Sequence, residues 1–190
     1  MPGSMIHLIL AKKVNPEGSV SYFVGNIAPD AIKDRHDADA THFRDLKDRQ
    51  PALISFAKEA INDFTEGILL HLYFDWKWDT IIRQKYINMV GDEWFATYRN
   101  ELGFAGSYAF HHTDWAKQLW HDMDSLDVSC YGTTPRTSAD DVKIHVNRNN
   151  KWHNDNITEP SQAFPPELID SFTTQIAKEY IDWRASYERN

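Results

Sequence analysis

Hydrophobic and polar positions follow a helical period along most of the chain, most clearly from Phe64 to about Asn88. On a helix with about 3.6 residues per turn, Glu66, Tyr73, Lys77 and Gln84 share one side. The opposite side carries a mostly apolar set that includes one histidine and two aspartates: Phe64, Ile68, His71, Asp75, Trp78, Asp79 and Ile82. The pattern therefore predicts that His71 and the two aspartates point into the interior of the protein.

The remaining segments with helical periodicity extend over most of the sequence. They are Met5–Val14 with Ser4 as its N-cap, Pro51–Ile61, Asp92–Leu102, Tyr108–Leu126, a polar helix or loop at Ala139–Asn150, and a closing helix at Pro166–Tyr187. Tyr22–Phe43 mixes Gly, Pro, Asp and His, which favours a loop, and Tyr131–Asp141 is typical of a linker. Because strand alternation is nearly absent, we predict an all-α fold, a multi-helix bundle forming one domain over residues 1–190.

Composition narrows the class of protein. The chain has 190 residues, 42% of them hydrophobic, which is enough for one domain with a continuous core. A net charge of -8 without a lysine or arginine run argues against duplex nucleic acid or an anionic membrane as partner, because both need a basic surface. Metal cations suit this charge better.

The sequence also bears on the compartment. The apolar run near the N-terminus lacks a basic leader and a small-residue cleavage site, so we expect no signal peptide. No window approaches the roughly 20 apolar residues of a transmembrane helix. The single cysteine, Cys130, excludes an intramolecular disulfide and is expected to be buried. We therefore expect a cytoplasmic protein, and nothing in the pattern indicates an oligomeric state.

His71 and Asp75 are the first candidate for chemistry. They stand at i and i+4, so their side chains meet on one helix face and can present a nitrogen and an oxygen to the same divalent cation. The same spacing also occurs in plain hydrogen-bonded pairs. An unpaired polar group in an apolar interior costs several kcal/mol, so a partner is required. Three further potential ligands lie upstream: His7, Asp30 and His42.

Four motifs carry a resemblance to a known family. The segments "MPGSMIHLILAKKV", "FVGNIAPDAI", "THF" and "GILLHLYFDWKWD" resemble the zinc-dependent phospholipase C family, all-helical hydrolases related to single-strand-specific zinc nucleases. The resemblance is confined to the first 85 residues or so, and rests on the order and context of these motifs.

The resemblance implies a zinc centre. It implies that His42, His71 and Asp75 hold one zinc ion, with Asp30 as a ligand or a nearby general base, and that His7 and the second oxygen of Asp75 hold another. Imidazole and carboxylate groups suit zinc, and two such ions activate water for attack on a phosphodiester. The expected activity is zinc-dependent hydrolysis of a small phosphoester, with Asp30 as the catalytic carboxylate.

The chain also departs from the family pattern. Secreted members use the amino group of an N-terminal tryptophan as a ligand, and this chain has no cleavage site that would create one. Members with three zinc ions add a later histidine and a His-x-x-x-Glu pair. None of the candidates His111, His112, His121 and His145 has a carboxylate four residues later. We therefore expect no complete third site. For His111 and His112 the plainer interpretation is a capping or packed histidine, and the alternative is one further ligand or a phosphate contact.

The other histidines and the tryptophans favour plainer interpretations. We expect His36, His145 and His153 at the solvated surface, and the acidic run His121–Asp127 at a solvated helix end. The tryptophans at 76, 78, 94, 115 and 120 are expected to be core contacts.

Two alternative functions stay open. An HD-domain phosphohydrolase places an adjacent His-Asp pair on its metal, and the chain offers His36-Asp37 and His121-Asp122. That alternative leaves His71 and Asp75 unexplained. The second alternative is a non-catalytic protein in which the same five residues form a structural or storage site, closed by protein ligands and without an open position for water.

Overall fold

The computed structural model describes residues 2–32, 34–132 and 136–188. The helices run in the order α1 (Ser4–Val14), α2 (Val20–Ile27), the 3-10 turn η1 (Ala28–Ala31), α3 (Arg35–Thr41), α4 (Gln50–Glu59), α5 (Asp63–Trp78), the π-helical turn η2 (Asp79–Arg83), α6 (Gln84–Val90), α7 (Trp94–His112), α8 (Ala116–Ser125), the 3-10 turn η3 (Val128–Cys130), α9 (Ala139–Asp155) and α10 (Pro166–Glu188). No β-strand forms within these ranges, so the all-α prediction is confirmed there.

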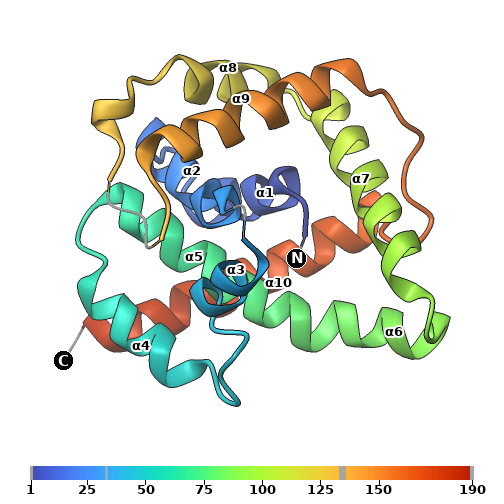
Figure 1. The fold of residues 1–190 in the computed structure, drawn as a ribbon, viewed down its shortest axis with the longest axis horizontal. Helices are drawn as coiled ribbons and strands as arrows, with labels where there is room; N and C mark the ends of the chain where they lie inside the picture. The colour runs from blue at the N-terminus through green and yellow to red at the C-terminus, as the bar shows by residue number, and fades with distance from the viewer. Residues whose placement is uncertain (1, 33, 133–135, 189–190) are drawn as a thin grey trace.

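Helix α1 is the central element of the bundle (Figure 1). It contacts α2, α5, α7 and α10. Apart from Ile9, every residue from Ser4 to Ala11 is buried, which includes His7. Because neighbouring helices enclose α1 on several sides, its residues from Met5 to Ala11 are apolar except for His7, which is therefore an interior residue.

Helices α2 and α5 pack most extensively of all the pairs of elements, and two glycines permit their close approach. A Cβ atom added at Gly25 would lie 2.0 Å from the carbonyl oxygen of Phe64, and one at Gly67 would lie 2.1 Å from that of Tyr22. Only glycine avoids these clashes. The contact places the backbone of Asn26 beside His71, where it takes part in the site described below.

The prediction of a loop over Tyr22–Phe43 is wrong for the residues that the structure describes, which exclude residue 33. This stretch contains most of α2, all of η1 and the helix α3. Its turn-forming residues act as helix boundaries: Pro29 stands in the first turn of η1, and Asp34 caps α3. Helix α2 begins before the stretch and is capped by the Ser19 side chain. The irregular composition therefore marked the ends of short helices.

Other helix limits also differ from prediction. Helix α7 continues unbroken through residues 103–107, where Gly103 and Gly106 lie beside Trp152 and His153 of α9. The break falls at Thr113 instead. The predicted long helix from Phe64 is divided by the π-helical turn after Trp78. The linker predicted over Tyr131–Asp141 lies partly outside the described residues, which omit 133–135.

Burial confirms most of the predicted core. The inward set on α5 and η2 from Phe64 to Ile82 is buried, whereas Tyr73 on the predicted outer side is also buried, against α10. Trp78 and Trp120 are fully enclosed, and Trp76, Trp94 and Trp115 pack against the core. The prediction that Cys130 is buried is wrong: it is exposed, because the short η3 turn lies at the surface and covers no apolar face.

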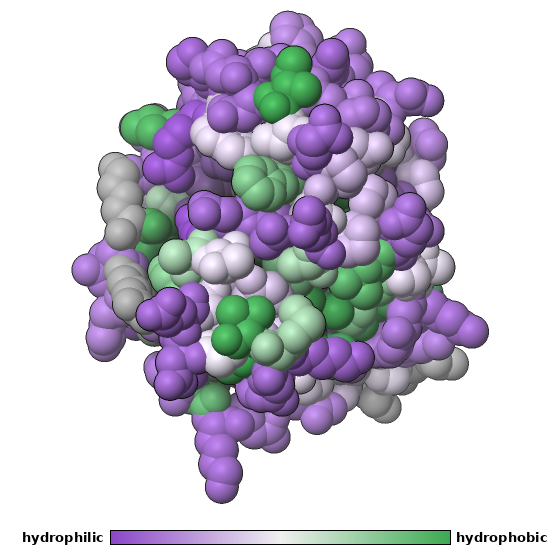
Figure 2. Space-filling view, turned by 90° about the vertical axis from the view of Figure 1, so that its right-hand side faces the viewer, coloured by the Kyte–Doolittle hydropathy of each residue, from purple (hydrophilic) through white to green (hydrophobic). Residues whose placement is uncertain are grey.

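The outer surface is mainly polar. Figure 2 shows the side on which α7 lies as predominantly hydrophilic, with hydrophobic residues in separate groups. Among the described residues, no helix combines the length and the apolar character that crossing a bilayer requires.

Candidate metal centre

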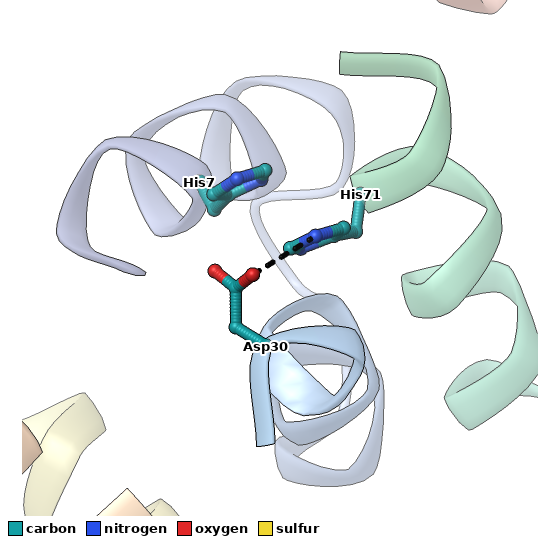
Figure 3. Close-up of side chains that lie close together, drawn as sticks. All are labelled: His7, Asp30 and His71. Carbon is teal, nitrogen blue, oxygen red and sulfur yellow. Dashed lines mark ion pairs between the residues drawn. The ribbon is translucent and has the colours of Figure 1, made fainter. Parts of the chain in front are cut away.

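Five side chains from four parts of the chain converge in the interior. His7 comes from α1, Asp30 from η1, His42 from the residue after α3, and His71 and Asp75 from α5. Four of these side chains are almost fully enclosed, whereas the Asp30 side chain retains 10% exposure. Their ligand atoms form two groups, His7–Asp30–His71 and His42–His71–Asp75, within 4.8 Å. Figure 3 shows the Asp30 carboxylate pointing toward the nearly parallel rings of His7 and His71.

The backbone orients two of the imidazoles. His71 Nδ1 lies 2.7 Å from the carbonyl oxygen of Asn26, and His42 Nδ1 lies 2.6 Å from that of Ala38. A carbonyl oxygen only accepts hydrogen bonds, so each Nδ1 carries a proton and donates. In the neutral imidazoles each Nε2 therefore presents a lone pair, as in the usual backbone support of metal-binding histidines.

These two Nε2 atoms lie 3.0 Å apart. Two lone pairs at this distance repel each other unless a cation lies between them or one ring is protonated. Two nitrogen ligands of a tetrahedral zinc ion, each about 2.0–2.1 Å from the metal, are about 3.3–3.4 Å apart. Asp30 Oδ1 and Asp75 Oδ2 lie 3.4 Å and 3.6 Å from His42 Nε2. The donor set of two imidazole nitrogens and two carboxylate oxygens fits zinc.

His7 and Asp75 face each other at the other side of the cluster. His7 Nε2 lies 3.4 Å from Asp75 Oδ1, without hydrogen-bond geometry, and neither nitrogen of His7 has a hydrogen-bond partner. Asp75 Oδ1 and Asp30 Oδ1 are likewise buried without one. Since Asp75 directs Oδ1 at His7 and Oδ2 at His42, its carboxylate has the orientation that a bridge between two ions requires. Buried donor and acceptor atoms usually have a partner, so a cation bound by these imidazole nitrogens and carboxylate oxygens would account for the four atoms.

The electrostatics of the cluster favour additional positive charge. Burial and the adjacent His7 lower the pKa of His71 to about 3, so this ring is neutral at neutral pH. Burial alone would lower the pKa of His42, but the nearby Asp30 and Asp75 raise it. Burial opposes ionisation of Asp75 as well, yet Arg44 and the histidines hold its pKa well below the usual range. The ionised carboxylates therefore need a proton on His42 or a metal ion.

Arg44 is a functional neighbour that the sequence patterns missed. Its Nη2 lies 2.6 Å from Asp75 Oδ2, and its Nε lies 3.0 Å from Asp79 Oδ2. Asp79 also pairs with Arg49 and Arg83, at 2.9 Å and 3.1 Å. Asp79 is thus held by arginines and is no ligand, although it shares the inward face of the chain with Asp75. In the sequence, the position of Arg44 two residues after His42 was the one indication that it lies near the cluster.

A cavity of about 480 Å³ opens beside the cluster. Asp30 lines it, together with Ser4 of α1 and with His145, Arg148, Asn149 and His153 of α9. The prediction that His145 and His153 are solvated is wrong: they are 6% and 3% exposed. They stand on one face of α9 with Asn149, at four-residue spacing, and this face packs against the rest of the bundle. The four-residue spacing indicates that His145 and His153 share one side of the helix, but it does not show that this side is buried.

The remaining candidate histidines lie apart from the five-residue cluster. His36 is exposed, as expected, and forms a surface group with Asp34 and Asp37. His121 is also exposed, so neither His-Asp pair of the HD-domain alternative joins the buried centre.

His111 and His112 do not join the cluster either. His111 Nε2 contacts the carbonyl oxygens of His153 and Asn156 at 2.9 Å and 3.0 Å. His112 Nδ1 contacts that of Tyr108 at 2.8 Å, and its ring stacks on Tyr108. Backbone carbonyl groups thus occupy both histidines, away from the five ligands.

Comparison of the chain with family models, with curated proteins and with solved structures finds no match. The buried cluster and the cavity beside it therefore carry the functional conclusion.

Proposed function

We propose that the protein is a zinc-dependent hydrolase of phosphoric esters. The observation that carries the proposal is the position of Asp30, which belongs to the buried donor set and also lines a cavity. A metal-ligand carboxylate in a cavity wall gives a substrate and water access to the ion, which an enclosed structural site does not. The order of His7, Asp30, His42, His71 and Asp75 supports the same proposal, because it agrees with the resemblance to the zinc-dependent phospholipase C family.

The assignment of ligands is the one that the resemblance implies, and the distances within the cluster support it. His42, His71 and Asp75 would hold one ion with Asp30 at its open side, and His7 and the second oxygen of Asp75 would hold another. When bound, zinc supplies Lewis acidity toward a phosphate oxygen and lowers the pKa of water.

Asp30 is the residue to which we assign proton transfer. Burial opposes its ionisation, but His71 and His42 lower its pKa below the ordinary value, so the carboxylate is ionised at neutral pH. Its Oδ1 faces His42 and His71. Its second oxygen can then orient a water molecule in the cavity and accept a proton from it.

The burial of the other four side chains favours one competing function, a non-catalytic metal-binding protein. The two differ in whether the metal-loaded protein turns over a substrate. The experiment measures zinc content by elemental analysis, and hydrolysis of bis(p-nitrophenyl) phosphate and p-nitrophenyl phosphate, by wild type, Asp30→Asn and Asp45→Asn. Asp45 is exposed and belongs neither to the donor set nor to the cavity lining, so its variant controls for the loss of one carboxylate.

Asp30→Asn should keep the fold and lose at least a hundredfold in kcat, in line with typical contributions of general bases of about 10²–10⁴-fold. Asp45→Asn should match wild type. Full activity of Asp30→Asn would remove Asp30 from the mechanism. A zinc-loaded wild type that hydrolyses neither ester would overturn the proposal in favour of the binding protein.

A further inference from the structure

The cavity beside the metal centre has a charge pattern that the metal ligands do not explain. Its charged and hydrogen-bonding lining includes Ser4, Asp30, Arg99, His145, Arg148, Asn149 and His153. In the described parts of the chain, neither Arg99 nor Arg148 forms an ion pair with a carboxylate, whereas Arg44, Arg49 and Arg83 all do. Two arginines without an anionic partner among the described residues therefore line the cavity that adjoins the five-residue cluster.

The histidines of the cavity add no competing charge. Burial lowers the pKa of His145, and it lowers the pKa of His153 to about 4, so both rings are neutral at pH 7. Among the described residues, Asp30 is then the only carboxylate in the lining, and its charge would be offset by the ion that it helps to bind. The cavity as a whole is electropositive when metal is bound.

Arg148 has more N–H donors than the acceptors around it can satisfy, whereas the Asn149 amide nitrogen also donates to the His145 carbonyl oxygen at 2.8 Å. Arg148 Nη2 lies 3.1 Å from His145 Nδ1, and Asn149 Nδ2 lies 3.2 Å from His145 Nε2. A neutral imidazole has a single acceptor nitrogen, so it satisfies one of these donors and not both. The guanidinium of Arg148 has five N–H donors, and His145 is its one hydrogen-bond partner among the described residues. Most of them are available to a ligand.

The amino end of α1 faces the same cavity. Pro2, Gly3 and Ser4 line it, and no side chain caps this helix. The first N–H groups of a helix have no intrahelical acceptor, and the helix dipole is positive at this end, so both favour an anion. A second observation points to a ligand: the buried His153 side chain lines the same cavity, and its Nδ1 has no hydrogen-bond partner among the described residues, so it can donate to a bound anion in the tautomer that is protonated at Nδ1.

We propose that this cavity is a phosphate-binding pocket of the substrate, in which Arg148, Arg99 and the amino end of α1 bind a dianionic phosphate beside the metal centre. The proposal rests on the proposed hydrolase function and names its substrate class: small organic phosphates with at least two negative charges. Guanidinium groups bind phosphate oxygens in pairs, which a monoanionic diester matches less well. A volume of about 480 Å³ suits a small molecule.

The first test uses inorganic phosphate as the probe, because its binding is measured without turnover. Calorimetry at pH 8 and low salt compares zinc-loaded wild type with Arg148→Gln, Arg99→Gln and the control Lys151→Gln. Lys151 is an exposed cation on the same helix, paired with Asp155 and outside the cavity lining. Loss of a charge-assisted contact should raise Kd for phosphate about tenfold in Arg148→Gln. Arg99→Gln should raise it less, and the control should leave it unchanged.

The second test separates KM from kcat. For p-nitrophenyl phosphate, a dianion, Arg148→Gln should raise KM about tenfold with little change in kcat, and Arg148→Lys should recover part of the loss. For the monoanion bis(p-nitrophenyl) phosphate, KM should change less. Both arginines are exposed, so the variants should melt like wild type.

The outcomes separate this pocket from the hydrolase function. Phosphate binding that is absent from wild type, or unchanged in Arg148→Gln and Arg99→Gln, would overturn the pocket even if the protein hydrolyses esters. Arginine-dependent phosphate binding without turnover of any ester would support the pocket and overturn the hydrolase function. An equal rise of KM for the monoester and the diester would overturn the preference for dianions.

Discussion

The molecule contains two groups of buried histidines, and they differ in what surrounds them. His7, His42 and His71 lie with the carboxylates of Asp30 and Asp75. His145 and His153 on α9 lie against an arginine, an amide and aromatic rings, with no carboxylate within ion-pair distance in the described chain. Both groups are enclosed to a similar degree.

The comparison shows that burial alone does not make a histidine a metal ligand. A buried imidazole without an anionic neighbour gives up its proton and stays neutral, as the pKa of His153 near 4 illustrates. Carboxylates in the first group add negative charge that only a cation offsets. The second group leaves the positive charge of Arg148 unbalanced, so it favours an anion. One site is thus suited to metal and the adjacent one to phosphate.

The largest effect is expected from metal removal. A metal that binds only the folded state at a thousandfold excess over its Kd adds about 4 kcal/mol to the free energy of unfolding, or about 8–16 °C in Tm. Chelation should therefore lower the melting temperature by about this amount, and added zinc should restore it. Calorimetry and elemental analysis check this result. An unchanged melting curve in protein shown to be metal-free would remove the distinction between the two groups of histidines.

Replacement of single ligands should reproduce part of that loss. Asp75→Asn should weaken both ions, because the amide carries no charge to offset two dications and its nitrogen is no ligand while protonated. His7→Ala should release only the second ion. Metal counts on the two variants, with His153→Phe as a control that keeps its metal, distinguish these outcomes. Equal loss in both, or full stoichiometry in Asp75→Asn, would leave Asp75 as a residue that merely orients the ligands.

The second group, His145 and His153, should make the free energy of unfolding depend on pH. His153 has a pKa of about 4 in the folded protein against 6.5 for a free side chain. Above pH 6.5 the His153 imidazole is mostly neutral in both the folded and the unfolded protein. Between pH 6.5 and 4 it binds a proton in the unfolded chain but stays neutral in the folded protein. Stability therefore falls as the pH drops through this window, by about 3 kcal/mol for this residue.

The measurement uses metal-free protein, so that zinc release does not contribute. Urea unfolding of His153→Phe from pH 7 to 4 should give a flatter profile than that of wild type. The exposed His36, replaced by Gln, serves as the matched control and should keep the steep profile. Parallel profiles for wild type and His153→Phe would show that His153 is protonated in the folded state.

The smallest effect concerns the scaffold of the first group. In Gly67→Ala the new Cβ would lie 2.1 Å from the Tyr22 carbonyl oxygen and 2.7 Å from the Asn26 nitrogen, so α2 and α5 must separate. Such overpacking should destabilise the protein by about 2 kcal/mol. It should also weaken zinc binding, since Asn26 orients His71. In Gly103→Ala the new Cβ makes only ordinary contacts with Trp152, at 3.8 Å, and both properties should be retained. A Gly67→Ala protein as stable as wild type would mean that the helices adapt.

The sequence by itself determined the helical class and the residues of the first group. Periodicity placed His71 and Asp75 on the buried face of α5, because that face is defined by spacing along a single helix. The resemblance named His7, Asp30 and His42 as the remaining candidate ligands, and the structure brings all five side chains together.

Only the tertiary structure decided the surroundings of those residues. Arg44 contacts Asp75 across 31 positions of the sequence, and the Asn26 carbonyl contacts His71 across 45. The enclosure of His145 and His153 depends on α9 packing over the amino end of α1 and the glycines of α7. Local patterns show which side of a helix is apolar, but they do not specify which distant element covers it. A polar face such as that of α9 is therefore indistinguishable from solvent-exposed surface until the bundle closes around it.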